Sequence, residues 1–250
     1  MAQVFHPGMN TISRVSILLG ITLPVALLGA TSAITRSGYN TKVDIPLDQP
    51  VPFSHQHHVN ELGIDCRYCH SSVEKSANAG VPPTHTCMSC HSQIWTNSPL
   101  LEPVRESYRS NTPIKTASGE LGWNRLNKVP DFVYFNHSIH INRGISCNIC
   151  HGPVQNMQLA YKGKPFFMVW CLNCHRNPEN YVRDMSDPKQ NIFNLYRKFQ
   201  RNEPLSAEEY AISLGHEYQR SPQELEEGRR VLAKYHVKKA QLTDCWVCHR

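Results

Sequence analysis

Cysteine and histidine recur in this chain at a spacing that can attach a cofactor. All ten cysteines lie in five CxxCH motifs, so no thiol is left over. CxxCH is typical of c-type haem attachment, in which both thiols bond to the porphyrin vinyl groups and the histidine binds the iron. The cysteines are Cys66, Cys69, Cys87, Cys90, Cys147, Cys150, Cys171, Cys174, Cys245 and Cys248, and the iron ligands are His70, His91, His151, His175 and His249.

Zinc binding or thiol redox chemistry could explain a single CxxC motif, but neither explains all five CxxCH motifs. One CxxC pair also suits a zinc site or a thioredoxin-like redox pair. Five motifs that each end in histidine and together use every cysteine disfavour both alternatives. Disulfides are disfavoured further, because thioether bonds would consume all the thiols. The sequence therefore predicts five covalently bound haem c groups.

The stretch before the first motif returns before the third motif. Residues 53–70 read FSHQHHVNELGIDCRYCH, and residues 135–151 read FNHSIHINRGISCNICH. Aligned with one residue dropped, the copies share the opening Phe, two histidines spaced i, i+3, an Asn, a Gly-Ile pair and the closing CxxCH. Such a repeat indicates one structural unit used twice. The C-terminal site is a partial third copy, in which His236 keeps the second histidine position and Ala233 replaces the first.

Each iron needs a second ligand on its other face, and the repeat supplies candidates. Two histidines at i and i+3 lie on one face of a helix, where they could serve two adjacent haems. His57 lies between such a pair and points away from that face. His6 precedes the apolar segment described below and is excluded. The repeat selects His55, His58, His137, His140 and His236, one for each predicted iron.

Two other side chains remain alternatives as iron ligands. His85 lies two residues before Cys87, and Met168 lies three residues before Cys171. His85 could instead neighbour a haem propionate, and Met168 could pack its soft thioether against a ring. A His/Met haem has a higher reduction potential than a His/His haem, so the choice affects the direction of electron flow.

Composition limits both the core and the partners. Mean hydropathy is −0.45, and the most apolar stretch is N-terminal, so the rest of the chain is short of hydrophobic core unless haem fills it. The net charge is +6 with His neutral. Five haems would add ten propionates and about one positive charge per ferric porphyrin core, so the loaded protein would be near neutral. No run of Lys and Arg is long enough to indicate a nucleic-acid surface.

One segment is apolar enough to enter a membrane. Val15 to Ile34 carries no charge, and as a helix it would be about 30 Å long, which matches the hydrocarbon core of a bilayer. A cleaved signal peptide is the alternative, but no strong A-x-A site follows, so we expect an uncleaved signal anchor over 12–35. Haem is attached covalently outside the cytoplasm. Residues 1–11 would therefore be a cytoplasmic tail, and the haem domain would lie on the periplasmic or outer face of the cytoplasmic membrane.

The elements that must position the motifs are predicted to be helices and irregular segments, because strand patterns are hard to find. Ser206 with Glu209 fits a capping box, and Ser221 with Glu224 fits an N-cap. We expect a mostly α and irregular, haem-cored multihaem cytochrome c with one transmembrane helix. Its segments would be a linker at 36–52, a di-haem module at 53–108, a loop at 109–130, a second di-haem module at 131–180, a helical spacer at 181–230 and a fifth haem site at 231–250.

The anchor, the five CxxCH motifs and the HxxH-plus-CxxCH modules resemble the class III, or c3/c7-like, multihaem cytochrome family. The arrangement is most similar to the pentahaem cytochrome c subunit of alternative complex III, a quinol-oxidising membrane complex. The resemblance implies an electron-transfer subunit without catalytic residues, beside an iron–sulfur subunit, integral-membrane subunits and a mono-haem cytochrome. The stretches that carry it are FSHQHH…CRYCH, THTCMSCH, FNHSIH…CNICH, FMVWCLNCH and CWVCHR, and they cover nearly the whole chain.

Two competing functions fit the sequence less well than an electron relay does. A pentahaem nitrite reductase uses an open iron at a CxxCK site, whereas all five motifs here end in histidine. A stand-alone anchored quinol dehydrogenase that feeds periplasmic reductases needs its own quinol pocket. For such a pocket, residues 38–52 offer only Lys42, Asp44 and Asp48 as polar groups. We therefore expect an electron-relay subunit of a respiratory or photosynthetic complex rather than an enzyme.

Overall fold

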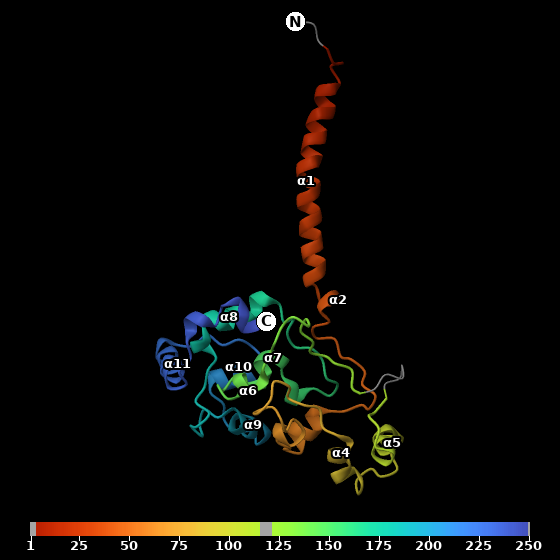
Figure 1. The fold of residues 1–250 in the computed structure, drawn as a ribbon, viewed down its shortest axis with the longest axis vertical. Helices are drawn as coiled ribbons and strands as arrows, with labels where there is room; N and C mark the ends of the chain where they lie inside the picture. The colour runs from red at the N-terminus through yellow and green to blue at the C-terminus, as the bar shows by residue number, and fades with distance from the viewer. Residues whose placement is uncertain (1–3, 116–121, 250) are drawn as a thin grey trace. The chain divides into compact units, whose positions relative to one another are not determined.

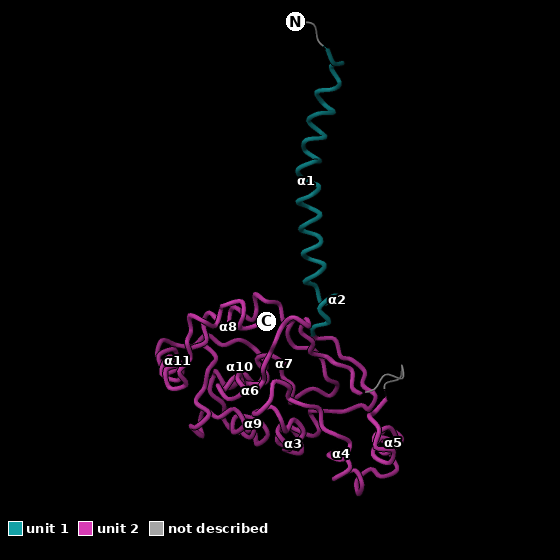
Figure 2. Tube along the Cα trace, in the orientation of Figure 1, with its two compact units in different colours: residues 1–43 teal, residues 44–250 magenta. Residues whose placement is uncertain are grey.

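The computed structural model describes residues 4–115 and 122–249. The chain divides into two compact units, Met1–Val43 and Asp44–Arg250, which Figure 2 colours separately. Residues 1–3 of the expected tail and residues 116–121 of the expected loop lie outside the described residues. The motifs all fall in the second unit.

The first unit consists of two helices, α1 (Met9–Arg36) and the short α2 (Gly38–Thr41). No residue of α1 is buried, and the helix is long and apolar enough to cross a membrane. Thr22 and Thr31 donate their hydroxyls to carbonyl oxygens four residues earlier, at 2.9 and 2.7 Å, so these polar groups are satisfied within the helix. α1 is therefore the candidate membrane span that the sequence predicted.

The second unit is built from short helices joined by irregular segments (Figure 1). This confirms the predicted mostly helical fold with few strands, and an isolated antiparallel bridge joins Pro46 to Tyr161. The elements are η1 (Gln56–Glu61), α3 (Cys66–Cys69), α4 (Thr84–His91), η2 (Pro99–Leu101), α5 (Glu102–Ser110), α6 (His137–Ile141), α7 (Cys147–His151), η3 (Val154–Asn156), α8 (Met168–Arg176), η4 (Pro178–Asn180), α9 (Ile192–Gln200), α10 (Ala207–Ser213), α11 (Pro222–Lys234), η5 (Lys239–Gln241) and α12 (Cys245–Cys248).

Every CxxC pair is helical. α3, α7 and α12 begin at the first cysteine of a motif, whereas α4 and α8 contain the motif in their second half. On a helix, residues i and i+3 lie on one face. Both sulfurs of each motif can therefore reach the same porphyrin.

The core is divided among small clusters, and cysteines line most of them. Cys66 and Cys147 both pack against the cluster around Ile192 and against the cluster around Leu195. Cys87 packs against the cluster around Val104. Because the buried apolar side chains gather around the attachment sites, the haems would complete the core.

The C-terminal end of the expected linker, residues 36–52, packs against the rest of the second unit. Val51 is buried against Leu101 and Val104. The side chain of Gln49 donates to the Asn124 carbonyl at 3.0 Å and accepts from the Asn124 N–H at 2.9 Å. The end of the linker is therefore part of the second unit, because its apolar and amide side chains find partners there.

The expected helical spacer holds α9, α10 and α11. Both predicted N-termini are confirmed, since Ser206 with Glu209 and Ser221 with Glu224 form complete capping boxes. α9 buries Ile192, Leu195 and Phe199 along one side, next to the first and third motifs. The spacer therefore supplies apolar cover for two attachment sites.

Candidate haem sites

The second copy of the repeat places its two histidines opposite two motif histidines. The rings of His137 and His151 are parallel within 1°, with their centres 6.3 Å apart. The rings of His140 and His175 lie 6.2 Å apart. The first histidine of the copy therefore faces its own motif, and the second faces the next motif along the chain.

The first copy follows the same rule. His58 faces His91 of the second motif, with ring centres 6.2 Å apart. His55 lies close to His70 of its own motif: burial lowers the pKa of His55 to about 4, and His70 is the next cause. The structure therefore brings together eight of the ten predicted iron ligands, in four pairs.

The spacing of these pairs fits an iron between the rings. An imidazole nitrogen binds a transition metal at about 2 Å, and that nitrogen lies about 1 Å from the ring centre. Two imidazoles on opposite sides of one iron therefore have centres about 6 Å apart, as three of the pairs do.

Hydrogen bonds leave the metal-binding nitrogen of these rings free. His58 Nδ1 lies 2.8 Å from the Ser54 carbonyl oxygen, and His140 Nδ1 lies 2.7 Å from that of Asn136. A carbonyl only accepts, so Nδ1 carries the proton and Nε2 keeps its lone pair. The same arrangement, at 2.7–3.2 Å, joins His70 to Gly80, His91 to Ile94, His137 to Ala77, His175 to Leu242 and His249 to Phe132.

Two of the paired rings differ in this respect. His151 Nδ1 lies 2.8 Å from the side-chain amide of Asn127. His55 Nδ1 is buried and has no hydrogen-bond partner among the described residues. A buried N–H without an acceptor is costly, and a haem propionate would satisfy it. The residues of these sites therefore fit haem c.

A phenylalanine orients the histidine pair in each copy. Phe53 stacks on His58 at 4.4 Å and meets His55 edge-on at 4.9 Å. Phe135 repeats this arrangement on its own copy, at 4.5 and 4.8 Å. Because one ring touches both histidines, it fixes their relative direction.

The copies differ in one backbone feature, which explains the extra residue in the first copy. η1 is a π-helix rather than the expected α-helical turn, and Leu62 N–H donates to the His57 carbonyl five residues earlier at 3.0 Å. The wider turn absorbs one residue between the histidines and the following glycine. Gly63 and Gly144 then adopt the same left-handed conformation, with φ of 71° and 74°. The motif therefore starts from equivalent geometry in both copies.

The two copies also clasp each other. His137 donates its backbone N–H to the Ala77 carbonyl at 3.1 Å, and its Nδ1 binds the same oxygen at 2.8 Å. In the reverse direction, Gln56 N–H donates to the Met157 carbonyl at 3.0 Å, and Asn60 donates to the Asn156 side chain at 3.2 Å. The histidine segment of each copy is thus held by the loop that follows the CxxCH motif of the other copy.

Contacts among the first three motifs show which are neighbours. The hydroxyls of Tyr68 and Ser89 lie 2.8 Å apart and join the first motif to the second. The first and third motifs meet beside α9, where Cys66 and Cys147 share two apolar clusters. His70 also contributes, after burial and His137, to lowering the pKa of His151 to about 4.

The fourth and fifth motifs extend this series of neighbouring motifs into a row. Burial raises the pKa of the Cys150 thiol to about 12, with Cys174 as the next cause, so the third and fourth motifs are close. Burial and then Cys248 raise the pKa of Cys171, and His175 Nδ1 lies 2.8 Å from the carbonyl oxygen of Leu242, just before the fifth motif. These sulfurs become thioethers on haem attachment, so the shifts matter here as signs of proximity. The spatial order is second, first, third, fourth, fifth.

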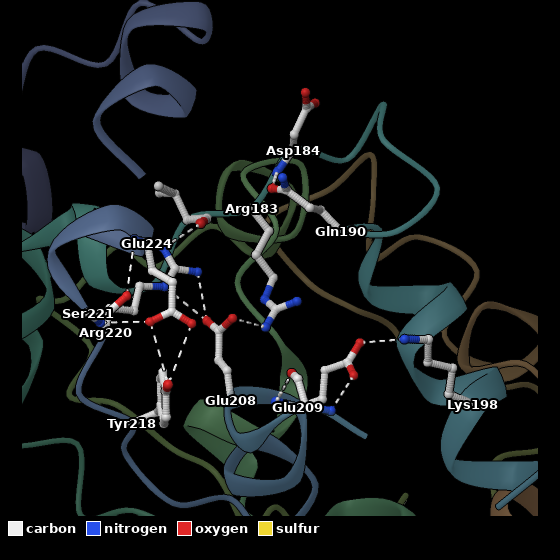
Figure 3. Close-up of polar contacts among 12 residues, drawn as sticks. Arg183, Asp184, Gln190, Lys198, Glu208, Glu209, Tyr218, Arg220, Ser221 and Glu224 are labelled. Atoms are coloured by element: carbon white, nitrogen blue, oxygen red, sulfur yellow. Dashed lines mark hydrogen bonds and ion pairs between the residues drawn. The ribbon is translucent and has the colours of Figure 1, made fainter. Parts of the chain in front are cut away.

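A buried ion cluster, drawn in Figure 3, stabilises the chain next to the turn that precedes the third motif. Glu208 lies between two guanidiniums, 2.8 Å from Arg183 Nη2 and 2.8 Å from Arg220 Nη2. Both arginine side chains are 6% exposed. The Arg183 backbone N–H donates to the Arg143 carbonyl at 3.0 Å, directly before Gly144. The cluster therefore holds the backbone that leads into the motif.

The remaining histidines of the second unit do not lie opposite a motif histidine in the described part of the chain, although His57 meets the ring of His58 edge-on at 5.4 Å. His57 is exposed and pairs with Glu61 at 2.8 Å. His85 is exposed and meets Tyr108 edge-on at 4.7 Å. His236 is exposed, and among the described residues no ring contact joins it to His249. Sequence reasoning did not identify the carbonyl acceptors of Nδ1 or the role of Asn127, because any residue carries a carbonyl.

Facing histidines beside attachment motifs define the class of protein as a multihaem cytochrome c. The chain belongs to the cytochrome c552 family, whose model matches residues 95–249 and thus the last three motifs. It is also 30% identical over 182 residues to the multiheme cytochrome c subunit of a menaquinone reductase from Nitratidesulfovibrio vulgaris, strain Hildenborough. That match covers 65% of this chain and 81% of the relative.

Proposed function

We propose that the protein is a membrane-anchored pentahaem cytochrome c that relays electrons within a quinol-oxidising complex similar to alternative complex III. The observation that carries this proposal is the row of five adjacent motifs, four of which have a second histidine opposite the motif histidine. Haem c supplies one-electron chemistry at iron. The chain attaches, spaces and caps these centres.

Each group of residues has a distinct task in this relay. The cysteines attach the porphyrins, and the motif histidines bind the irons. His55, His58, His137 and His140 fill the opposite faces and exclude outside ligands. The carbonyl acceptors of Nδ1 fix the ring orientation and raise the basicity of the bound nitrogen. Because these four irons would be closed to substrates, we propose that the chain transfers electrons and has no catalytic residues.

We further propose where the protein sits and what surrounds it. α1 would anchor it in the cytoplasmic membrane, with the second unit on the periplasmic or outer face, where haem is attached. The partners would be an iron–sulfur subunit as donor, integral-membrane subunits that handle quinol, and a mono-haem cytochrome or an oxidase as acceptor. The quinone-linked complex named for the Nitratidesulfovibrio relative supports such partners.

The same relative favours a second candidate, in which electrons flow in the opposite direction. It is named as part of a menaquinone reductase, so the present row would then deliver electrons to quinone. The chain would keep the same residues in the same tasks. The two candidates differ in the partners at the two ends of the row.

Purification of the intact complex from native membranes tests these proposals. Mass spectrometry should find five haems on this chain, together with membrane and iron–sulfur subunits. Quinol should reduce the haems, and an oxidised mono-haem cytochrome should reoxidise them. Quinone reduction by pre-reduced haems, without quinol oxidation, would favour the second candidate. Robust quinol oxidation by the isolated chain would contradict the relay and favour a stand-alone quinol dehydrogenase.

A further inference from the structure

The fifth motif departs from the rule that the first four obey. In both copies of the repeat, the second histidine faces the next motif. The first histidine faces its own motif in the second copy and lies close to its own motif in the first copy. In the partial third copy, Ala233 stands at the first position and His236 at the second. The rule therefore assigns no histidine of this copy to the fifth haem.

The placement of His236 agrees with this reading. It follows the end of α11 in a left-handed conformation with φ of 53°, not in the helical turn that aligns the other pairs. Its side chain is exposed. By contrast, His58 and His140 are partly buried, and their Nδ1 atoms bind carbonyl oxygens. His236 has none of the features that prepare the other histidines for iron.

Met168, unlike His236, lies on a helix face that is turned toward the fifth attachment site. It is the first residue of α8 and lies one turn before Cys171, so the two side chains share a helix face. His175, seven residues after Met168 and so on the same face of α8, has its Nδ1 2.8 Å from the carbonyl oxygen of Leu242, just before the fifth motif. The α8 face that carries Met168 is therefore turned toward the fifth site.

Two further observations single out Met168. The corresponding position, three residues before the first cysteine, holds Gly63, Thr84, Gly144 and Leu242 in the other motifs, none of which can bind iron. Met168 is also 67% exposed, and Trp246 inside the fifth motif is 61% exposed. A porphyrin attached at the fifth motif would cover both large side chains.

We propose that Met168 is the second protein ligand of the haem attached to Cys245 and Cys248, and that His236 is not. This inference rests on the proposed pentahaem function. A thioether sulfur is a softer ligand than imidazole, and His/Met ligation raises the reduction potential above that of His/His haems. Because the fifth motif ends the row, the high-potential haem would be terminal. Electrons would then leave the chain at this end.

Variants of the holoprotein, purified within its complex, test this assignment. The native protein should show the far-red methionine–iron charge-transfer band for one of its haems. Met168→Leu should abolish the band, convert one haem to high spin and allow it to bind carbon monoxide. Met168→His should restore a low-spin haem without the band and lower the most positive midpoint potential. His236→Ala, and Val169→Ala as the matched control on α8, should leave the band and the spin state unchanged.

Several outcomes would overturn the assignment. These are a native protein without the band, a Met168→Leu variant with an unchanged spectrum, or a high-spin haem in His236→Ala. The haem count by mass spectrometry separates this inference from the proposed function. Fewer than five attached haems would contradict the pentahaem relay itself. Five haems with an unchanged Met168→Leu spectrum would contradict only the methionine ligand.

Discussion

At the scale of single residues, most of the histidines that lie in facing pairs turn Nδ1 toward a backbone carbonyl oxygen, which leaves Nε2 available. The chain has fourteen histidines, and composition alone does not separate them. The repeat selected five, and four of these lie opposite a motif histidine. The fifth, His236, shares only sequence position with the others. The spacing pattern therefore predicted which histidines lie opposite a motif histidine where the whole unit was repeated, but not where half of the unit was lost.

Removing one second ligand should open one iron. In His58→Ala or His140→Ala, we expect all haems to stay attached while one of the five becomes high spin, because the motif histidine still binds its iron. Electron paramagnetic resonance of the oxidised protein measures this change. His57→Ala is the matched control, since His57 pairs with Glu61 at the surface. A low-spin spectrum in His58→Ala would show that His91 has a different partner.

The two repeat glycines should differ in how well they tolerate a side chain. Both have a left-handed conformation, which costs an L-residue about 1–2 kcal/mol. A Cβ on Gly144 would also lie 2.6 Å from the carbonyl oxygen and Cβ of Arg183, whereas one on Gly63 would lie 3.8 Å from the flexible end of Gln200. Gly144→Ala should therefore lower the free energy of unfolding by more than Gly63→Ala. Chemical denaturation measures this difference, and equal losses would contradict the close approach.

At the scale of elements, capping patterns were predictable and the π-turn was not. A capping box is a local exchange of hydrogen bonds, so Ser206 with Glu209 and Ser221 with Glu224 could be recognised from sequence. The repeat alignment showed that one copy has an extra residue. It did not show that η1 absorbs this residue, because a bulge, a longer loop or a π-turn would fit the same alignment. Tertiary contacts at both ends of the segment decide among them.

Glu208 should be essential to the stability of the second unit. Glu208→Gln leaves two buried guanidiniums without their shared counter-charge, and breaking a buried pair in this way costs about 3–5 kcal/mol. Glu226→Gln on α11 is the matched control, because its pair with Arg229 is exposed and such pairs contribute about 0–1 kcal/mol. Denaturant titration of both holoproteins measures the contrast. Similar small losses for the two variants would show that Arg183 and Arg220 find other partners.

Acid should weaken one contact between α11 and the segment that precedes α9. The hydrogen bond from Lys234 is the main reason that the pKa of Asp184 falls to about 2, from about 4 in an unfolded chain. A lowered carboxyl pKa stabilises the fold above the unfolded value, and this contribution is lost as pH falls from about 4 to about 2. Asp184→Asn should therefore be less stable than the native protein at pH 7, with the difference vanishing toward about pH 2. A pH-independent difference would contradict this contribution from Asp184.

At the scale of the whole molecule, the number of CxxCH motifs could be read from the sequence but their order in space could not. The motifs follow the chain as first to fifth, whereas neighbouring contacts place the first between the second and the third. This order depends on packing across α9 and on the reciprocal hold between the two copies. Neither feature leaves a local pattern in the sequence.

The spatial order predicts unequal consequences for losing different haems. Cys66→Ala with Cys69→Ala removes a haem from inside the row, whereas Cys87→Ala with Cys90→Ala removes one from its end. The first variant should leave the haem of the second motif cut off from the other three, and its reduction should become much slower. Stopped-flow reduction resolved by haem measures this, with thermal unfolding as the stability readout. Equal kinetics in both variants would contradict the order.

The reciprocal clasp between the copies has a consequence for how the protein is made. Synthesis, and with it export of the segment that follows α1, runs from the N-terminus toward the C-terminus. The loop that holds Gln56 and Asn60 lies about one hundred residues after them, at Asn156 and Met157. The first histidine segment therefore cannot close when it emerges. During that interval Cys66 and Cys69 would remain accessible to the attachment machinery. Because the first half of the second unit would fold late, haem would be attached to its cysteines before the surrounding chain packs over them.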